Sequence, residues 1–154
     1  MNISLRKMID EEFRLYFDNK IERYSLVLSQ NVHEKGEESF VMASKQLNRL
    51  LPQGNGTPNH YLFNIYKDDY KIGYVWIKVE KEKKSAFLYE IYIFEEYRTK
   101  GFGTKVMNNV EKWLKDKDVH YFKLHVYGSN TGARRLYEEL GFEIAGISML
   151  KSIN

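Results

Sequence analysis

The chain has 154 residues, 43% of them hydrophobic and 29% charged, and its formal net charge is only +3. These values predict one folded domain over residues 1–154 and exclude a disordered chain, while dispersed charges and the lack of a recognised motif argue against nucleic-acid binding. Without cysteine there is no disulfide or thiolate chemistry, and without an apolar run of roughly 20 residues or a signal-peptide core we expect a cytoplasmic protein with no membrane partner.

The first third of the chain is predicted to be mainly helical. A short edge strand is expected at residues 2–5. Apolar residues recur every three or four positions over 7–31, which predicts a helix in one or two pieces, and the same spacing predicts a second helix over 37–50. Two prolines and two glycines between Pro52 and Pro58 then indicate a loop.

The remainder is predicted to be rich in strands. Runs at 61–66, 72–79 and 86–94 are separated by short turns, which indicates an antiparallel meander. A helix over 101–115 leads to a strand at 121–126, a crossover that implies a parallel pair with 86–94. A helix over 131–140 ends at Gly141, and 142–153 supply one or two closing strands. The expected fold is α/β (α+β): a mixed, mostly antiparallel sheet of six to seven strands flanked by about four helices.

A glycine-bearing turn joins the strand at 86–94 to the following helix, with the sequence Arg98-Thr99-Lys100-Gly101-Phe102-Gly103. The first backbone N–H groups of a helix have no partner within the helix, and together with the helix dipole they bind anions. The two glycines keep side chains away from this backbone. Because G-x-G-x-x-G and Gly-Lys-Ser/Thr are both absent, Rossmann and P-loop sites are excluded. We therefore expect a site for the phosphates of a nucleotide-like cofactor.

A second cluster follows the next predicted strand. It contains, in order, Asn130, Ala133, Leu136, Tyr137, Gly141 and Phe142. The two clusters together resemble the GNAT N-acetyltransferase superfamily. The first is similar to its Q/R-x-x-G-x-G/A acetyl-CoA loop and the second to its N-x-x-A-x-x-L/F-Y-x-x-x-G-F signature. The order of elements matches over nearly the whole chain, which is most similar to small bacterial members.

The resemblance implies acetyl-CoA as cosubstrate. No metal is expected, because the histidines show no spacing with carboxylates that suggests a metal site. The family's pantetheine arm pairs with the strand before the loop, and a bulge there opens a V-shaped cleft, although a bulge cannot be predicted from sequence. The pyrophosphate would lie on the N–H groups of the turn, with Arg98 or Lys100 supplying charge, and Asn130 aligns with a cofactor contact. The implied cofactor site comprises Ile91, Tyr92, Ile93, Arg98, Thr99, Lys100, Gly101, Phe102, Gly103, Thr104, Asn130, Ala133 and Tyr137.

The resemblance also implies the catalytic residues. Tyr137 aligns with the family's usual general acid, which protonates the departing thiolate. The general base is open between His125, a residue type suited to proton transfer near neutral pH, and Glu90, acting directly or through water. Since no cysteine can form an acetyl intermediate, the expected reaction is direct attack of a primary amine in a ternary complex.

Structural interpretations compete with these roles. Tyr137 can be a core residue, Asn130 an N-cap, His125 a plain strand residue, Glu90 a structural carboxylate, and Arg98 and Lys100 ordinary surface charges. A non-catalytic acyl-CoA sensor and a transferase using another acyl donor are the alternative functions. The sequence does not identify the amine acceptor, small molecule or protein, or decide whether the protein is a homodimer.

Overall fold

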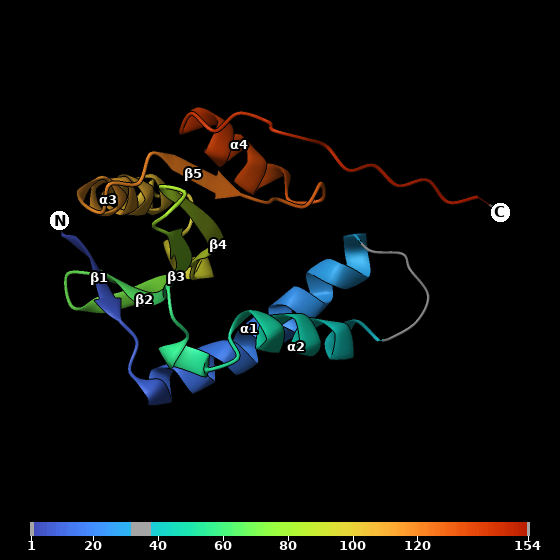
Figure 1. The fold of residues 1–154 in the computed structure, drawn as a ribbon, viewed down its shortest axis with the longest axis horizontal. Helices are drawn as coiled ribbons and strands as arrows, with labels where there is room; N and C mark the ends of the chain where they lie inside the picture. The colour runs from blue at the N-terminus through green and yellow to red at the C-terminus, as the bar shows by residue number, and fades with distance from the viewer. Residues whose placement is uncertain (1, 32–37, 154) are drawn as a thin grey trace.

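A five-stranded sheet in the order β1-β2-β3-β4-β5 lies at the centre of the computed structural model, which describes residues 2–31 and 38–153 (Figure 1). The strands are β1 (Ile3–Lys7), β2 (His60–Lys67), β3 (Tyr70–Glu80), β4 (Ser85–Ile93) and β5 (Tyr121–Leu124). Strands β1 to β4 pair antiparallel, and β4 pairs with β5 in parallel. The predicted meander, crossover and mixed, mostly antiparallel sheet are confirmed.

Helices cover both faces of the sheet (Figure 1). The helices α1 (Asp10–Asn31) and α2 (Ser39–Leu50) pack on one face, and α3 (Phe102–Asp116) and α4 (Thr131–Glu139) on the other. Two short 3-10 turns, η1 (Gly54–Gly56) and η2 (Glu95–Tyr97), join elements. Four α-helices over the described ranges agree with the predicted number, and α1 is one unbroken helix. None of these helices is long and apolar enough to cross a bilayer.

Each face of the sheet has its own apolar core. Under α3 the fully buried Val106, Met107 and Val110 meet alternating residues of the strands, as their spacing of three and four predicts. Burying each such side chain contributes about 1.5–3 kcal/mol. Under α1 and α2 the core is built around Tyr16 and Trp76, which are both 1% exposed. The two cores hold the sheet between helix pairs and so fix the position of β4.

The closing strands predicted at 142–153 are not formed. No strand is present between Phe142 and Ile153, and the sheet therefore has five strands rather than six to seven. The segment instead leaves the body of the protein as an extended trace (Figure 1). Its apolar pattern suits a strand, but a strand also requires a neighbour for its backbone groups, and periodicity does not supply one. Strand β5 likewise ends at Leu124 and not at Val126.

Candidate active site

A bulge in β4 opens the sheet. Trp76 of β3 pairs with Glu90 and Ile77 with Leu88, so Tyr89 is an extra residue on β4. The parallel pairing of β4 with β5 stops at the same level, at Leu88 and Leu124. Beyond this level the two strands no longer pair, and a gap begins between them. Sequence reasoning had no means of locating this bulge.

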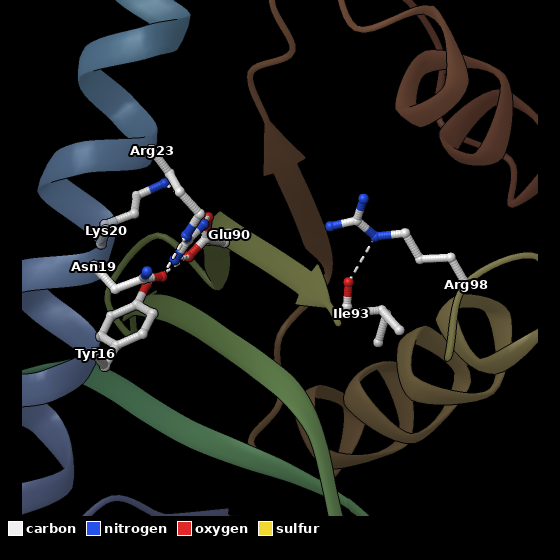
Figure 2. A network of polar contacts seen from close by, with 7 residues as sticks. All are labelled: Tyr16, Asn19, Lys20, Arg23, Glu90, Ile93 and Arg98. Carbon is white, nitrogen blue, oxygen red and sulfur yellow. Dashed lines mark hydrogen bonds and ion pairs between the residues drawn. The ribbon is translucent and has the colours of Figure 1, made fainter. Parts of the chain in front are cut away.

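The end of β4 turns backbone groups toward this gap that pair with no strand. The Phe94 N–H donates to Ile72 O, so strand alternation turns the backbone groups of Ile91 and Ile93 away from β3 and those of Tyr92 toward β3. Arg98 folds back and donates from Nε to Ile93 O at 2.7 Å (Figure 2). Of the three predicted pantetheine contacts, Ile91 and Ile93 therefore face the gap through their backbones, and Tyr92 does not.

The glycine-bearing turn ends in an uncapped helix terminus. Thr99 and Gly101 have φ of 60° and 81°, left-handed values that glycine adopts freely. No side chain caps α3, and its first helical bond is from Lys105 N–H to Gly101 O, which leaves the preceding N–H groups without a helical partner. A Cβ built on Gly101 would meet no atom within 4 Å. The turn is thus an open set of donors suited to an anion.

The two sequence clusters meet at the start of α3. A Cβ built on Gly103 would lie 3.3 Å from Leu136 Cδ2, so the glycine lets α4 pack closely on α3. Asn130 caps α4, because its Oδ1 accepts from the Ala133 N–H at 3.2 Å. The residue after Leu136 is Tyr137, which is half-buried. Burial and the negative charge of Glu90 raise the pKa of Tyr137 to about 12, so the phenol keeps its proton at neutral pH.

A cleft of about 560 Å³ joins these elements to α1 and α2. Its wall at the bulge is aromatic, since Tyr89 stacks on Trp76 with ring centroids 4.6 Å apart. The cleft brings together six of the predicted site residues: Glu90, Ile91, His125, Asn130, Ala133 and Tyr137. The predicted phosphate-binding residues Arg98, Thr99, Lys100, Gly101, Phe102, Gly103 and Thr104 lie outside its lining.

Glu90 lies in a cluster of charges between β4 and α1 (Figure 2). Its carboxylate accepts from Tyr16 Oη at 2.8 Å, from Lys20 Nζ at 2.9 Å and from both terminal nitrogens of Arg23. Burial opposes ionisation, but the charges and hydrogen bonds of Lys20 and Arg23 outweigh it and lower the pKa of Glu90 to about 2. A carboxylate held this way is a weak base at neutral pH.

Sequence reasoning missed the partners of Glu90. Tyr16, Lys20 and Arg23 lie four and three residues apart, so they share one face of α1, and this spacing was the available signal. It also missed Tyr24, which donates to Gln46 Oε1 at 2.7 Å and lies 3.3 Å from the hydroxyl of Tyr127. Both tyrosines line the cleft and join α1 to the chain after β5. Among residues 2–31 and 38–153 no group of three or more candidate metal ligands occurs.

The sequence model of the acetyltransferase (GNAT) family matches residues 8–142. The chain belongs to the GNAT acetyltransferase family. This confirms the family resemblance of the two motifs and the N-acetyltransferase class. The chain is 30% identical to the uncharacterized N-acetyltransferase YycN of Bacillus subtilis (strain 168), over 99% of this chain and 100% of that protein.

Solved structures of GNAT proteins have the same fold. The crystal structure of YycN from Bacillus subtilis superposes with a TM-score of 0.94 at 28% identity, covering 99% of each chain. The PaiA N-acetyltransferase from Thermoplasma acidophilum, solved with coenzyme A, gives a TM-score of 0.67 at 21% identity, covering 96% of this chain and 94% of that one. A spermidine N(1)-acetyltransferase from Thermoplasma acidophilum is 22% identical over 94% of this chain and 90% of its own length.

Proposed function

We propose that this GNAT enzyme transfers an acetyl group from acetyl-CoA to a primary amine by direct attack in a ternary complex. The observation that carries the proposal is that three features occur where β4 ends: an uncapped α3 terminus, β4 backbone that pairs with no strand on the side of the gap, and a cleft that reaches Tyr137. A long cosubstrate with an anionic end and an amide-rich arm fits these features in that order.

Chain groups suited to hold acetyl-CoA come from both motifs. The N–H groups of residues 99–104 would bind the diphosphate, with Lys100 or Arg98 adding charge. The Phe102 side chain is buried in the core at 5% exposure, so only its N–H is offered. The backbones of Ile91 and Ile93 would bind the pantetheine amides. Asn130 and Ala133 line the cleft beside them.

We assign proton transfer to two residues of the cleft. Acetyl-CoA supplies an acetyl group activated as a thioester. His125 takes a proton from the acceptor amine, directly or through water, as the nitrogen–carbon bond forms. Tyr137 gives its phenolic proton to sulfur as the carbon–sulfur bond breaks. Of the two candidate bases, Glu90 is disfavoured because two cations already hold its carboxylate.

The cleft also supports a proposal about the acceptor. Of its described lining residues only Glu90 carries a carboxylate, and Lys20 and Arg23 together give that cluster an excess positive charge. A second cation on the acceptor would be repelled there, whereas an aromatic or aliphatic group would contact Trp76 and Tyr89. We therefore propose a monoamine with an apolar substituent, in contrast to spermidine. We also propose a homodimer as the working assembly.

Release of free CoA over a panel of amines tests this function. We expect turnover with acetyl-CoA, and a kcat/KM for phenethylamine at least about tenfold above that for spermidine, which corresponds to about 1.4 kcal/mol. Binding of acetyl-CoA with no CoA release from any amine would identify an acyl-CoA sensor instead. Thermal shifts with longer acyl-CoAs, larger than with acetyl-CoA, would identify a different acyl donor.

A further inference from the structure

Arg23 and Glu90 form a complete ion pair between α1 and β4 (Figure 2). The two terminal nitrogens of the guanidinium donate to the two carboxylate oxygens, a bidentate arrangement that matches one cation to one anion. The third nitrogen, Nε, donates to Asn19 Oδ1 at 2.7 Å, and the guanidinium carbon lies 4.0 Å from the centre of the Tyr92 ring. Arg23 therefore already balances the charge of Glu90, and each of its three nitrogens is engaged.

Lys20 is the cation in excess of this pair. Its Nζ donates to Glu90 Oε2 at 2.9 Å, and among residues 2–31 and 38–153 no second hydrogen-bond acceptor for this ammonium occurs. The Tyr24 ring lies 5.5 Å from Nζ, a cation–π contact that stabilises the ammonium without neutralising it. Because the Lys20 side chain is only 12% exposed, water compensates its charge incompletely. One positive charge and two N–H donors are thus left for a ligand.

This unbalanced charge lies in the wall of the cleft. Lys20 and Glu90 line the cleft, and the described lining residues include no Asp and no second Glu. The nearest carboxylate on the same face of α1 is Glu12, eight residues before Lys20, and it is held elsewhere, since its Oε2 accepts from Asn64 Nδ2 at 3.0 Å. A partly buried charge without a counter-charge is unfavourable, so a ligand that brings an anion gains affinity there.

The other groups of the cleft suit an amine with an apolar side chain. Trp76 and Tyr89 form its aromatic wall, and His125 and Tyr137 are the residues assigned to proton transfer. The charge of Glu90 acts on the pKa of Tyr137, which indicates that the ion cluster lies near the reacting end of the cleft. An amine, an apolar group and an anion are therefore each matched within one cavity. An α-amino acid with an apolar side chain carries all three on a single carbon.

We propose that the acceptor is an apolar α-amino acid whose carboxylate pairs with the ammonium of Lys20. This inference rests on the proposed function, because it names the acceptor of the same reaction. As nitrogen bonds to the acetyl carbon and the carbon–sulfur bond breaks, the amine becomes a neutral amide and the carboxylate keeps its charge. The N-acetyl product therefore retains the group that Lys20 binds. Lys20 sets specificity and takes no part in proton transfer.

Phenylalanine and phenethylamine are a matched pair of acceptors, because they differ by one carboxylate. Each is assayed by CoA release with the wild-type protein and with Lys20→Met, which removes the charge and leaves the pair of Arg23 and Glu90 in place. Comparing the ratio of the two kcat/KM values between proteins cancels the intrinsic reactivity of each amine. We expect the ratio of phenylalanine to phenethylamine to fall at least about tenfold in Lys20→Met. Arg14→Met, at an exposed position of α1, is the control and should leave the ratio unchanged, and an unchanged ratio in Lys20→Met would overturn the proposal.

Binding of the two products tests the same carboxylate without turnover and without a variant. N-acetylphenylalanine and N-phenethylacetamide are titrated by calorimetry into the wild-type protein saturated with CoA. We expect N-acetylphenylalanine to bind at least about tenfold more tightly, by an advantage that shrinks as the salt concentration rises. Equal affinities, or no binding of either product, would overturn the proposal.

The two experiments separate this inference from the proposed function. Turnover of phenethylamine with no gain from the carboxylate would refute the amino-acid acceptor and leave the acetyl transfer intact. Binding of N-acetylphenylalanine that weakens at least about tenfold in Lys20→Met, with no CoA release from any amine, would refute the acetyl transfer and leave the anion site intact.

Discussion

Replacing Glu90 with glutamine tests whether this carboxylate is a structural anchor or a catalytic base. The substitution keeps the size of the side chain but removes the charge that Lys20 and Arg23 share. Both cations lie mostly out of solvent, with side chains 12% and 19% exposed. Breaking a buried ion pair on one side costs about 3–5 kcal/mol, so we expect Glu90→Gln to lower the free energy of unfolding at neutral pH by about that amount.

The pH dependence of the free energy of unfolding gives a second estimate of how much the ionised Glu90 side chain stabilises the fold. In the folded protein the pKa of Glu90 is lowered from 4.5 to about 2, and at 1.36 kcal/mol per pH unit this contributes about 3 kcal/mol. Because the folded pKa is the lower one, the contribution is complete above about pH 5 and is lost as pH falls toward about 2. The Glu90→Gln variant has no carboxylate to protonate at this position, so its stability does not change for this reason. The free energies of unfolding of the wild-type protein and the variant should therefore converge as the pH falls.

Urea unfolding followed by tryptophan fluorescence, repeated from neutral pH to pH about 3, measures both effects. Glu80→Gln is the matched control, because it also removes a carboxylate that pairs with two lysines but lies at the surface, where little change is expected. Equal free energies of unfolding of the wild-type protein and Glu90→Gln at neutral pH would refute the structural role of the Glu90 carboxylate. A loss of turnover by more than about 10³-fold with unchanged stability would instead make Glu90 the base.

Three other variants test separate parts of the site. Tyr137→Phe should lower kcat by about 10²-fold and leave CoA affinity unchanged in calorimetry, and unchanged kcat would remove the tyrosine from the role of acid. His125→Ala should lower kcat to a similar degree, and an unchanged kcat would exclude the histidine as base. Gly73→Ala should lower the free energy of unfolding by about 1–3 kcal/mol, because its Cβ would lie 2.0 Å from Tyr92 O in β4. Gly56→Ala, where a Cβ meets nothing within 4 Å, is its control, and equal urea midpoints for the two would contradict this packing.

Most of the fold follows from periodicity in the sequence. The helix predicted at 101–115 and the strand predicted at 86–94 differ from α3 and β4 by one residue at each end. These elements bury one continuous face, so their apolar spacing is nearly complete. Helix α2 shows where apolar spacing misleads, because Phe40 and Val41 fit the spacing of a buried helix face but are 53% and 38% exposed. Its core contact runs instead through Ala43 and Leu47.

Features that depend on distant parts of the chain could not be predicted. The bulge at Tyr89 is defined by pairing with β3, and nothing in the local sequence marks it. The cluster around Glu90 joins residues about 70 positions apart, as in the pair with Lys20. The closing strands at 142–153 were predicted from a pattern that suits a strand but does not identify its partner. The two motifs can be recognised without knowledge of the fold because each is a short, local stretch of sequence, and the roles assigned to their residues stay predictions.

A titration of the isotope-labelled protein with CoA, followed by amide resonances, tests the central claim most directly. If the N–H groups at the start of α3 hold the diphosphate, the amides of Gly101, Phe102, Gly103 and Thr104 will show the largest shifts at saturation. Pantetheine, which lacks the diphosphate, will shift the amides of Ile91 and Ile93 and leave the turn unchanged. Saturating CoA with no shift at residues 101–104 would contradict the account.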